Sequence, residues 1–444
     1  MGSKFVLIGS GLAGGLLATF LGRRGDEVTL YERRADPRAG NTVGGRSINL
    51  ALSARGIHAL QQVGLADEVL QHAIPMRGRM IHDKSGTLHF SPYERDPAKC
   101  INSIGRGALN TVVIEAAQRY PNVRVLFNHR CTEVDLDAPA AHLIRSDTGA
   151  AVEARAEAII GVDGAFSAVR RSMQRLDRFE YSQSYLAHGY KELTIPPTNE
   201  GRWQMEKHAL HIWPRKSFMM IALPNPDGSF TCTLFWEFEG PRSFATVQGD
   251  DEVQRFFAEE FPDAVPLMPA LLEEYKENPT GSLVTIRCAP WHYEDKVALV
   301  GDAAHAVVPF YGQGMNAAFE DCVVFDECLA EFPNERRRAF AAYSARRKEN
   351  ADALADLALH NFIEMRDKTA SRAFRAKKRL DHVLEGVLSG LYLPLYTMVS
   401  FTRIPYAEAE RRAERQDRIV YASLLVLGLV FVLVLTVLLR ALSR

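Results

Sequence analysis

Three glycines and one acid near the start of the chain have the types and spacing that hold a dinucleotide. Gly9, Gly11 and Gly14 follow the apolar run 5–8, and Glu32 ends the next apolar run. In such a unit the first glycine permits a tight turn, the second lets a pyrophosphate approach the backbone, and the third lets a helix pack closely on a strand. The helix N-terminus favours phosphate, and the carboxylate of Glu32 can accept ribose hydroxyls. Because this acid disfavours a 2′-phosphate, the pattern predicts FAD or NAD rather than NADP.

Two later motifs narrow the choice between these dinucleotides. Asp163 follows an aliphatic run and precedes a glycine, and Asp302 lies in the Gly-Asp-Ala-Ala-His motif that ends at His305. We expect Asp302 to reach the ribityl chain of a flavin. The helix that begins near Gly314 should point its positive end at the flavin ring, where it would stabilise a reduced, anionic flavin. The three motifs in this order therefore indicate FAD. We interpret His305 as structural, because no Ser/Asp spacing suggests a catalytic triad.

The elements that must position these residues follow from the hydrophobic pattern. Residues 4–34 read as strand, glycine turn, helix and strand. The stretches 123–127 and 131–136 read as further strands of the same sheet. From 181 to 286, alternating segments separated by Pro and Gly turns predict an antiparallel sheet, and residues 319–406 read as helical. The sequence therefore predicts an α/β fold with a Rossmann-like first part.

Composition excludes several classes of protein. With 444 residues the chain is long enough for two or three domains, and its net charge of −1 argues against a nucleic-acid partner. The six cysteines are scattered, with no CxxC pair and no histidine at metal spacing. We therefore expect no metal site, and reduced, mostly buried thiols in a cytosolic compartment.

The C-terminal stretch Ile419–Leu439 is uncharged and consists mainly of Leu, Val and Ile. It is long enough to span a bilayer, since ~20 residues cross the hydrocarbon core. Four arginines precede it: Arg411, Arg412, Arg415 and Arg418. We predict a transmembrane anchor with the enzymatic body on the cytosolic side, because basic residues favour that side.

The motifs above, together with four further segments, resemble those of the kynurenine 3-monooxygenases, a family of single-component aromatic hydroxylases with the para-hydroxybenzoate hydroxylase fold. The four segments are 44–53, 76–80, 188–193 and 211–214, and the resemblance extends from Phe5 to about Tyr406. Together with the C-terminal apolar stretch, it divides the chain into five parts. These are an FAD-binding domain in two pieces (1–177 and 287–330), an antiparallel-sheet substrate domain (178–286), a helical region that closes the active site (331–418) and a membrane anchor (419–444).

The resemblance also implies an activity, namely 3-hydroxylation of L-kynurenine with NADPH and O2 in tryptophan degradation and NAD biosynthesis. In this chemistry NADPH reduces FAD, O2 adds to the reduced flavin, and the flavin hydroperoxide attacks the electron-rich ring. No residue is expected to act as a catalytic acid or base. The protein must instead orient the substrate and exclude water.

An amino-acid substrate needs a counter-charge for its carboxylate, and a guanidinium fork suits that purpose. The resemblance assigns this role to Arg79, with hydrogen bonds from Tyr93 and Asn361 and with Tyr396 completing the pocket; Arg77 is the competing candidate on spacing alone. Apolar residues implied in the substrate wall are Leu210, Met219, Ile221, Leu223, Phe235, Pro309 and Phe310, although each of the sheet residues could equally be ordinary core. Residues implied around FAD are Gly9, Gly11, Leu12, Ala13, Gly14, Glu32, Arg33, Ala51, Arg106, Cys131, Asp163, Asp302, Gly314, Met315 and Asn316.

Two other functions share parts of this pattern. A membrane-anchored FAD enzyme that acts on a lipid or on another aromatic substrate would have the same nucleotide motifs and anchor, but it would not need Arg79, Tyr93 and Asn361 as a carboxylate site. A non-catalytic, nucleotide-binding membrane scaffold would lack flavin absorbance.

Overall fold

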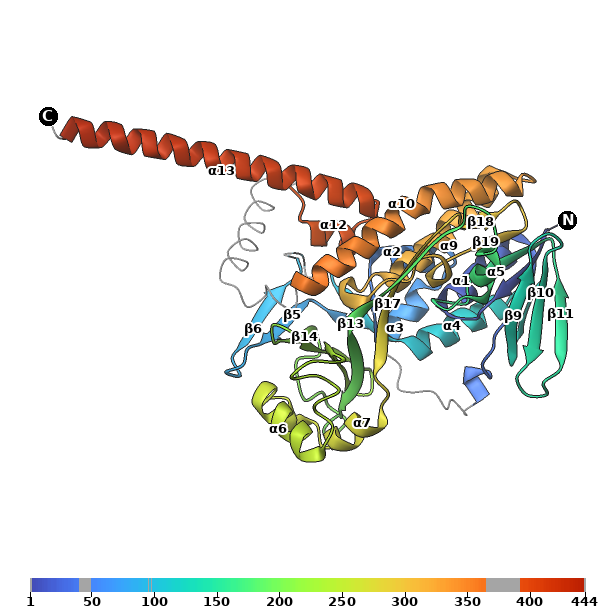
Figure 1. The fold of residues 1–444 in the computed structure, drawn as a ribbon, viewed down its shortest axis with the longest axis horizontal. Helices are drawn as coiled ribbons and strands as arrows, with labels where there is room; N and C mark the ends of the chain where they lie inside the picture. The colour runs from blue at the N-terminus through green and yellow to red at the C-terminus, as the bar shows by residue number, and fades with distance from the viewer. Residues whose placement is uncertain (1, 40–48, 95, 97, 365–391, 443–444) are drawn as a thin grey trace.

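The structure is a computed structural model that describes residues 2–39, 49–94, 96, 98–364 and 392–442. The glycines at 44 and 45 and the basic stretch between Arg366 and Arg379, both singled out in the sequence, lie outside the described residues. Two large sheets organise the body, and a long C-terminal helix projects from one end of it (Figure 1).

The first large sheet carries the nucleotide motifs. Its strands run in the order β18-β19-β12-β1-β2-β8, and all neighbours are parallel except β18 and β19. The strands are β1 (Lys4–Ile8), β2 (Glu27–Tyr31), β8 (Val123–Leu126), β12 (Ala158–Gly161), β18 (His292–Tyr293) and β19 (Val297–Leu299). Because β1, β12 and β19 lie side by side, the three motifs at their carboxyl ends meet at one edge of the sheet.

Helices cover this sheet, and several of them begin just after one of its strands. α1 (Leu12–Arg24) packs against α4 (Arg106–Gln118) and α9 (Gly314–Glu331). The shorter helices are α2 (Ala54–Gln62), α3 (Ala66–Gln71), α5 (Ala168–Met173) and α8 (Asp302–His305), with 3-10 turns at Pro37–Ala39, Val265–Leu267 and Pro309–Tyr311. The predicted strand–helix–strand unit at the N-terminus is confirmed.

Two small sheets flank the nucleotide-binding sheet. One consists of β9 (His129–Asp135), β10 (Ala140–Arg145) and β11 (Ala151–Arg155), and the other of β3 (Asn49–Leu52), β7 (Ile101–Gly105) and β4 (Ile74–Met76). The prediction that 123–127 and 131–136 share a sheet is wrong. Asn128 lies between them with φ 61°, and this left-handed turn directs β9 away from β8 to pair with β10.

The second large sheet has the strand order β17-β13-β16-β15-β14-β5-β6. Its strands are β5 (Gly78–His82), β6 (Leu88–Pro92), β13 (Glu180–Ile195), β14 (Ala209–Pro214), β15 (Met219–Pro224), β16 (Phe230–Glu237) and β17 (Gly281–Ala289). The predicted antiparallel pairing within 181–286 is confirmed, but β5 and β6 also join this sheet, through a parallel pairing of β5 with β14. α6 (Asp250–Glu260) and α7 (Leu271–Glu277) enclose an aromatic core that includes Trp213, Trp236 and Phe256.

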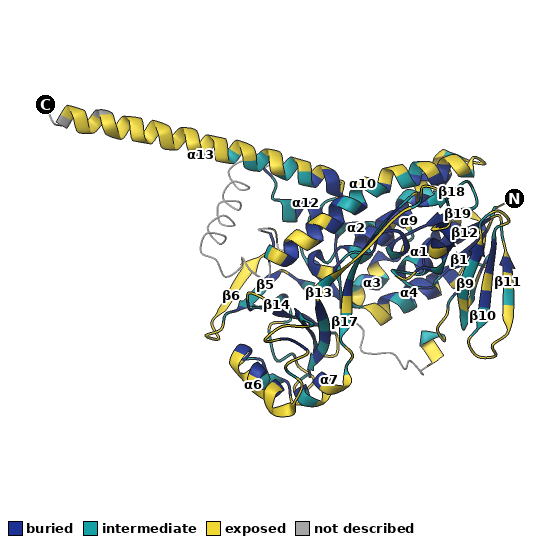
Figure 2. Cartoon of the chain, viewed as in Figure 1, coloured by how far each residue is buried: buried dark blue, intermediate teal, exposed yellow. Residues whose placement is uncertain are grey.

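Three helices complete the described C-terminal region: α10 (Arg336–Ile363), α12 (Leu395–Phe401) and α13 (Tyr406–Leu442). The start of α13 packs on α10 and α12, and Tyr406 is completely buried. The rest of α13 leaves the body, and its apolar side chains are exposed (Figure 2). One helix in the described chain, Tyr406–Ala441, is long and apolar enough to cross a membrane.

Candidate active site

A cavity of about 880 Å³ connects the nucleotide motifs with the second large sheet. Its wall includes Gly11 and Glu32 at one end and Arg79 and Phe235 at the other. Residues that are far apart in the sequence therefore line one continuous cavity, which extends from the first large sheet to the second.

The glycine turn after β1 opens toward this cavity. Gly9 adopts φ +106°, and a Cβ there would approach the Val162 carbonyl oxygen to 2.7 Å, so glycine is required. A Cβ on Gly11 would meet nothing within 4 Å, which leaves open space in front of that backbone. A side chain on Gly14 would collide with the Gly9 carbonyl, so this glycine permits the close packing of α1 on the turn. The turn is thus shaped to admit a ligand against the main chain.

Glu32 is held beside the turn by backbone donors. The Ser10 N–H donates to its Oε2 at 2.9 Å and the Arg34 N–H donates to its Oε1 at 3.0 Å. The Ser10 hydroxyl also donates to Oε2, at 3.4 Å, so Oε1 is the oxygen with the clearer capacity for a further hydrogen bond. Glu32 therefore keeps capacity for a ribose while its orientation is already set.

Asp163 gives the clearest test of whether a flavin nucleotide fits. Its Oδ2 accepts the Ala168 N–H at 2.7 Å, whereas its Oδ1 is buried with no hydrogen-bond partner among the described residues. Burial raises the pKa of this carboxyl above its ordinary value. An acceptor left in this state at the cavity wall, with Asp302 also on the wall, fits a ligand rich in hydroxyl groups.

Arginines give the nucleotide end a positive field. Arg33, Arg34, Arg106, Arg130 and Arg171 all line the cavity and are exposed. Guanidinium groups of this kind suit phosphate oxygens. The glycine turn, the acids and the arginines together fit FAD by their chemistry.

The other end of the cavity is aromatic around one cation. The Arg79 guanidinium carbon lies 4.6 Å from the ring centre of Tyr396 and 5.7 Å from that of Tyr93, and these two rings stack at 5.5 Å. Burial opposes the charge of Arg79, but Tyr396, Tyr93 and Glu364 outweigh it and raise its pKa above the ordinary value. Burial also raises the pKa of Tyr93 well above its usual range, so Tyr93 remains a neutral phenol.

Two buried polar atoms at this end make no hydrogen bond among the described residues. Arg79 Nε and the Tyr93 hydroxyl are buried without a hydrogen-bond partner in the described part of the chain. Arg77, the alternative on spacing, is exposed and is not part of the cavity wall. Of the two arginines, the structure places Arg79 in the cavity.

Most of the other predicted site residues also meet at the cavity. The wall includes Leu210, Met219, Ile221, Leu223, Phe235, Pro309 and Phe310 on the sheet side, and Leu12, Ala13, Ala51, Cys131, Gly314 and Met315 on the nucleotide side. Burial, with the nearby Asp163, raises the pKa of the Cys131 thiol to about 12, so it stays protonated.

Asn361 and Asn316 lie behind the wall rather than on it. The Asn361 amide donates to the Phe310 carbonyl at 2.7 Å, and the Asn316 amide donates to the Ala51 and Gly312 carbonyls at 2.8 and 2.9 Å. Both therefore hold wall segments in place. Direct contact of Asn361 with a substrate stays a prediction.

Sequence reasoning missed several wall residues. Tyr311 lines the cavity and stacks on Tyr396 at 5.7 Å, and Met76, Ile101 and Tyr190 line it as well. The position of Tyr311, directly after Pro309 and Phe310, was an available signal for this residue. Met76 and Tyr190 lie in the segments 76–80 and 188–193 that carry the family resemblance, but no site role was assigned to them. Ile101 comes from β7, whose partner strands are distant in sequence, so no local pattern marks it.

His305 is part of a buried ionic network. Its Nε2 lies 2.5 Å from Asp321 Oδ2, and Asp321 also accepts from Arg347 Nε at 2.6 Å and from the Gly301 N–H at 3.0 Å. The ring of His305 stacks on Trp291 at 4.9 Å. His305 is not on the cavity wall, so the interpretation of this histidine as structural fits the geometry.

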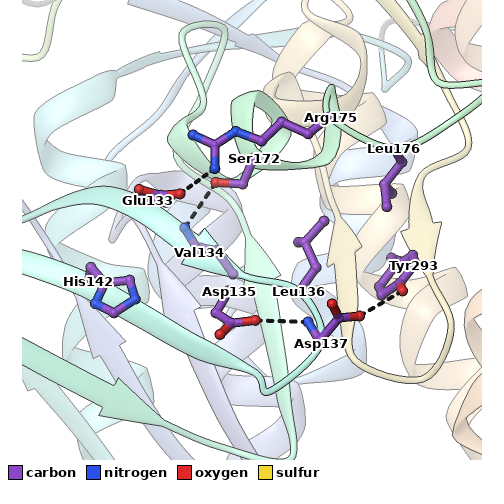
Figure 3. Close-up of a pocket in the computed structure, with 10 residues that line it drawn as sticks. All are labelled: Glu133, Val134, Asp135, Leu136, Asp137, His142, Ser172, Arg175, Leu176 and Tyr293. Carbon is purple, nitrogen blue, oxygen red and sulfur yellow. Dashed lines mark hydrogen bonds and ion pairs between the residues drawn. The ribbon is translucent and has the colours of Figure 1, made fainter.

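A second hollow, of about 420 Å³, lies between the β9–β11 sheet and α5 (Figure 3). Glu133, Asp135 and His142 line it, and Glu133 forms an ion pair with Arg175. None of the predicted site residues lies on its wall. No group of three or more potential ligands is arranged to hold a metal ion within the described residues.

Comparison with known proteins agrees with this geometry. Residues 3–358 match the family described as FAD binding domain. The fold is shared with 2-methyl-3-hydroxypyridine-5-carboxylic acid oxygenase (TM-score 0.67, 20% identity, 90% of this chain and 96% of that chain) and with PqsL of P. aeruginosa (TM-score 0.64, 21% identity, 82% and 99%). The family match and the site thus define an FAD-binding protein with the monooxygenase fold.

Relatives with much higher identity narrow the assignment. Kynurenine 3-monooxygenase of Myxococcus xanthus is 48% identical, over 93% of this chain and 89% of that protein. Kynurenine 3-monooxygenase of Dictyostelium discoideum is 46% identical, over 93% and 91%. This chain belongs to the kynurenine 3-monooxygenase family.

Proposed function

We propose that the protein hydroxylates L-kynurenine to 3-hydroxykynurenine with FAD as its bound cofactor and NADPH and O2 as co-substrates. The observation that carries this proposal is the position of Arg79, whose guanidinium lies among aromatic rings in the same cavity as the nucleotide motifs. This arrangement suits a substrate with an aromatic ring at one end and a carboxylate at the other.

The bound FAD supplies the redox chemistry, since it accepts reducing equivalents from NADPH and activates O2. We assign binding of FAD to the glycine turn, Glu32, Asp163, Asp302 and the arginines at that end of the cavity. Glu32 and Asp163 offer acceptors to hydroxyl groups, and Gly11 admits the pyrophosphate to the backbone.

The substrate end selects and orients the amino acid. Arg79 pairs with the carboxylate, and the Tyr93 hydroxyl, which has no partner among the described residues, donates to it. Met219, Phe235 and Phe310 form an apolar surface for the aromatic ring, with the Phe235 and Phe310 rings 4.9 Å apart. This surface also excludes water from the reacting atoms, which limits side reactions of reactive intermediates.

We further propose that α13 anchors the protein in a membrane, with the body on the cytosolic side. Support comes from the exposed apolar face over Ile419–Leu439 and from the arginines that precede it.

The test uses purified full-length protein in detergent. We expect a flavin absorbance spectrum, NADPH oxidation that increases on addition of L-kynurenine, and formation of 3-hydroxykynurenine. The structurally related control is an aromatic amine without the amino-acid carboxylate, which should not stimulate oxidation. A colourless protein would refute the flavoenzyme proposal. Equal stimulation by the control amine or by a lipid substrate would refute the proposed substrate class.

A further inference from the structure

The outer strand of the second large sheet exposes apolar side chains. β6 pairs only with β5, and all five of its residues are exposed (Figure 2). Leu88 is 53% exposed and Phe90 is 50% exposed. An exposed, apolar edge strand is a liability for a soluble protein, because it invites association. We therefore expect another surface to cover the exposed side of β6.

The hairpin of β5 and β6 lies at the end of the body from which α13 projects (Figure 1). Between Tyr406 and Arg418, α13 rises by about 18 Å at roughly 1.5 Å per residue. This charged portion lies beside the body, and the apolar portion begins only at Ile419. A bilayer that accommodates Ile419–Leu439 would thus meet the body at the end that carries the hairpin.

The polar groups at the turn between β5 and β6 form hydrogen bonds and an ion pair within the protein. Asp83 Oδ1 accepts the Ser85 and Thr87 backbone N–H groups, each at 2.9 Å, and the Ser85 hydroxyl at 2.6 Å. Lys84 Nζ lies 2.9 Å from a Glu260 carboxylate oxygen. These bonds hold the turn in one conformation, so its charged groups can stay in the hydrated headgroup region while Leu88 and Phe90 reach the boundary with the acyl chains.

We propose that the β5–β6 hairpin, residues 78–92, is a second membrane contact, in which Leu88 and Phe90 rest at the boundary between lipid headgroups and acyl chains. The inference depends on the proposed anchoring by α13. It selects lipid over a second copy of the chain, because the anchor brings a bilayer to this end of every molecule.

This contact would reach the active-site cavity through one strand pair. Arg79 lies on β5 opposite Ser91 of β6, and Tyr93 directly follows β6. The hairpin that rests on the bilayer therefore also provides the carboxylate end of the cavity, so the membrane fixes the position of that wall.

The test places an indole at the strand in the full-length chain. Phe90→Trp is compared with Leu126→Trp, a matched control at an exposed apolar position (38%) on β8, the edge strand of the other large sheet. Both proteins are reconstituted into phosphatidylcholine vesicles with either brominated or unmodified acyl chains. Emission of the wild-type chain with its four native tryptophans is subtracted.

We expect the indole at position 90 to be blue-shifted and quenched by the brominated lipid, and the indole at position 126 to be unaffected. Flotation of the vesicles tests the anchor separately. If the protein floats but the indole at position 90 is not quenched, the anchor stands and the hairpin contact is refuted, as it also is if both indoles are quenched equally. If the protein does not float with the vesicles, the anchor and the hairpin contact are both refuted.

Discussion

Replacement of Arg79 by alanine is the most direct test of the substrate site. The Arg79 guanidinium lies 4.6 Å from the Tyr396 ring and 5.7 Å from the Tyr93 ring, and its Nε is buried with no hydrogen-bond partner among the described residues. In Arg79→Ala a substrate carboxylate would enter this pocket without its counter-charge.

The magnitude follows from the cost of leaving one member of a buried charge pair alone. Truncating one partner of such a pair costs roughly 2–5 kcal/mol. At about 1.4 kcal/mol per tenfold change, this corresponds to a loss of about 30-fold to several thousandfold in kcat/KM for kynurenine. Arg79→Lys should recover little of it, because a point ammonium does not reproduce the planar fork.

The assay measures kynurenine-dependent NADPH oxidation, 3-hydroxykynurenine yield and flavin content for each variant. Flavin content should be unchanged, since Arg79 lies at the far end of the cavity from the glycine turn. Arg77→Ala is the matched control. Arg77 is exposed and off the cavity wall, so its loss should change kcat/KM by no more than ~2-fold. Near-normal kcat/KM in Arg79→Ala, or a large loss confined to Arg77→Ala, would refute the assignment.

Three further perturbations test other parts of the argument. Glu32→Ala should lower flavin retention on gel filtration, because charge-assisted hydrogen bonds of about 1.5–3 kcal/mol each are lost; retention equal to wild type would contradict the role of Glu32. Deletion of residues 419–444 should move the protein to the soluble fraction with flavin and activity retained, and a full-length chain that is already soluble without detergent would refute the anchor. Burial lowers the pKa of His211 to about 4, from the ordinary 6.5, so its contribution is fully present above pH 6.5 and is lost as pH falls toward 4, by about 3 kcal/mol in total. His211→Gln should flatten this dependence in urea unfolding followed by tryptophan fluorescence at pH 7 and 5, and an unchanged slope would contradict the argument.

The parts of the site that sequence predicted well are those encoded by short local patterns. The turn at Gly9, Gly11 and Gly14 requires specific backbone angles and close approaches, so the residue types alone reveal it. The strands before Asp163 and Asp302 are buried apolar runs that end at polar residues. Because parallel strands of one sheet end at the same edge, the fold class already predicted that Asp163 and Asp302 would lie near the glycine turn.

The parts that sequence missed depend on pairing between distant segments. β5 joins β14 with Arg79 opposite Leu210, although more than a hundred residues separate them. Nothing in residues 78–92 marks that partner, because strand propensity describes a pleated surface and not the identity of its neighbour. The same limit explains the wrong placement of β9, which has the pattern of a strand but belongs to a different sheet.

The choice between Arg77 and Arg79 shows how such pairing decides chemistry. Successive residues of a strand face opposite sides of its sheet, so Arg79 and His82 of β5, which are three positions apart, point in opposite directions. The ring of His82 stacks at 3.9 Å on buried Trp213, on the side of the α6 core, which leaves Arg79 to face the cavity. Arg77 has the same parity as Arg79 but precedes β5, and its backbone N–H bonds the His208 carbonyl at 2.8 Å while its side chain points to solvent. Spacing alone could not decide which of the two arginines reaches the cavity. The start of β5 decides it, because Arg79 lies within the strand and Arg77 lies before it.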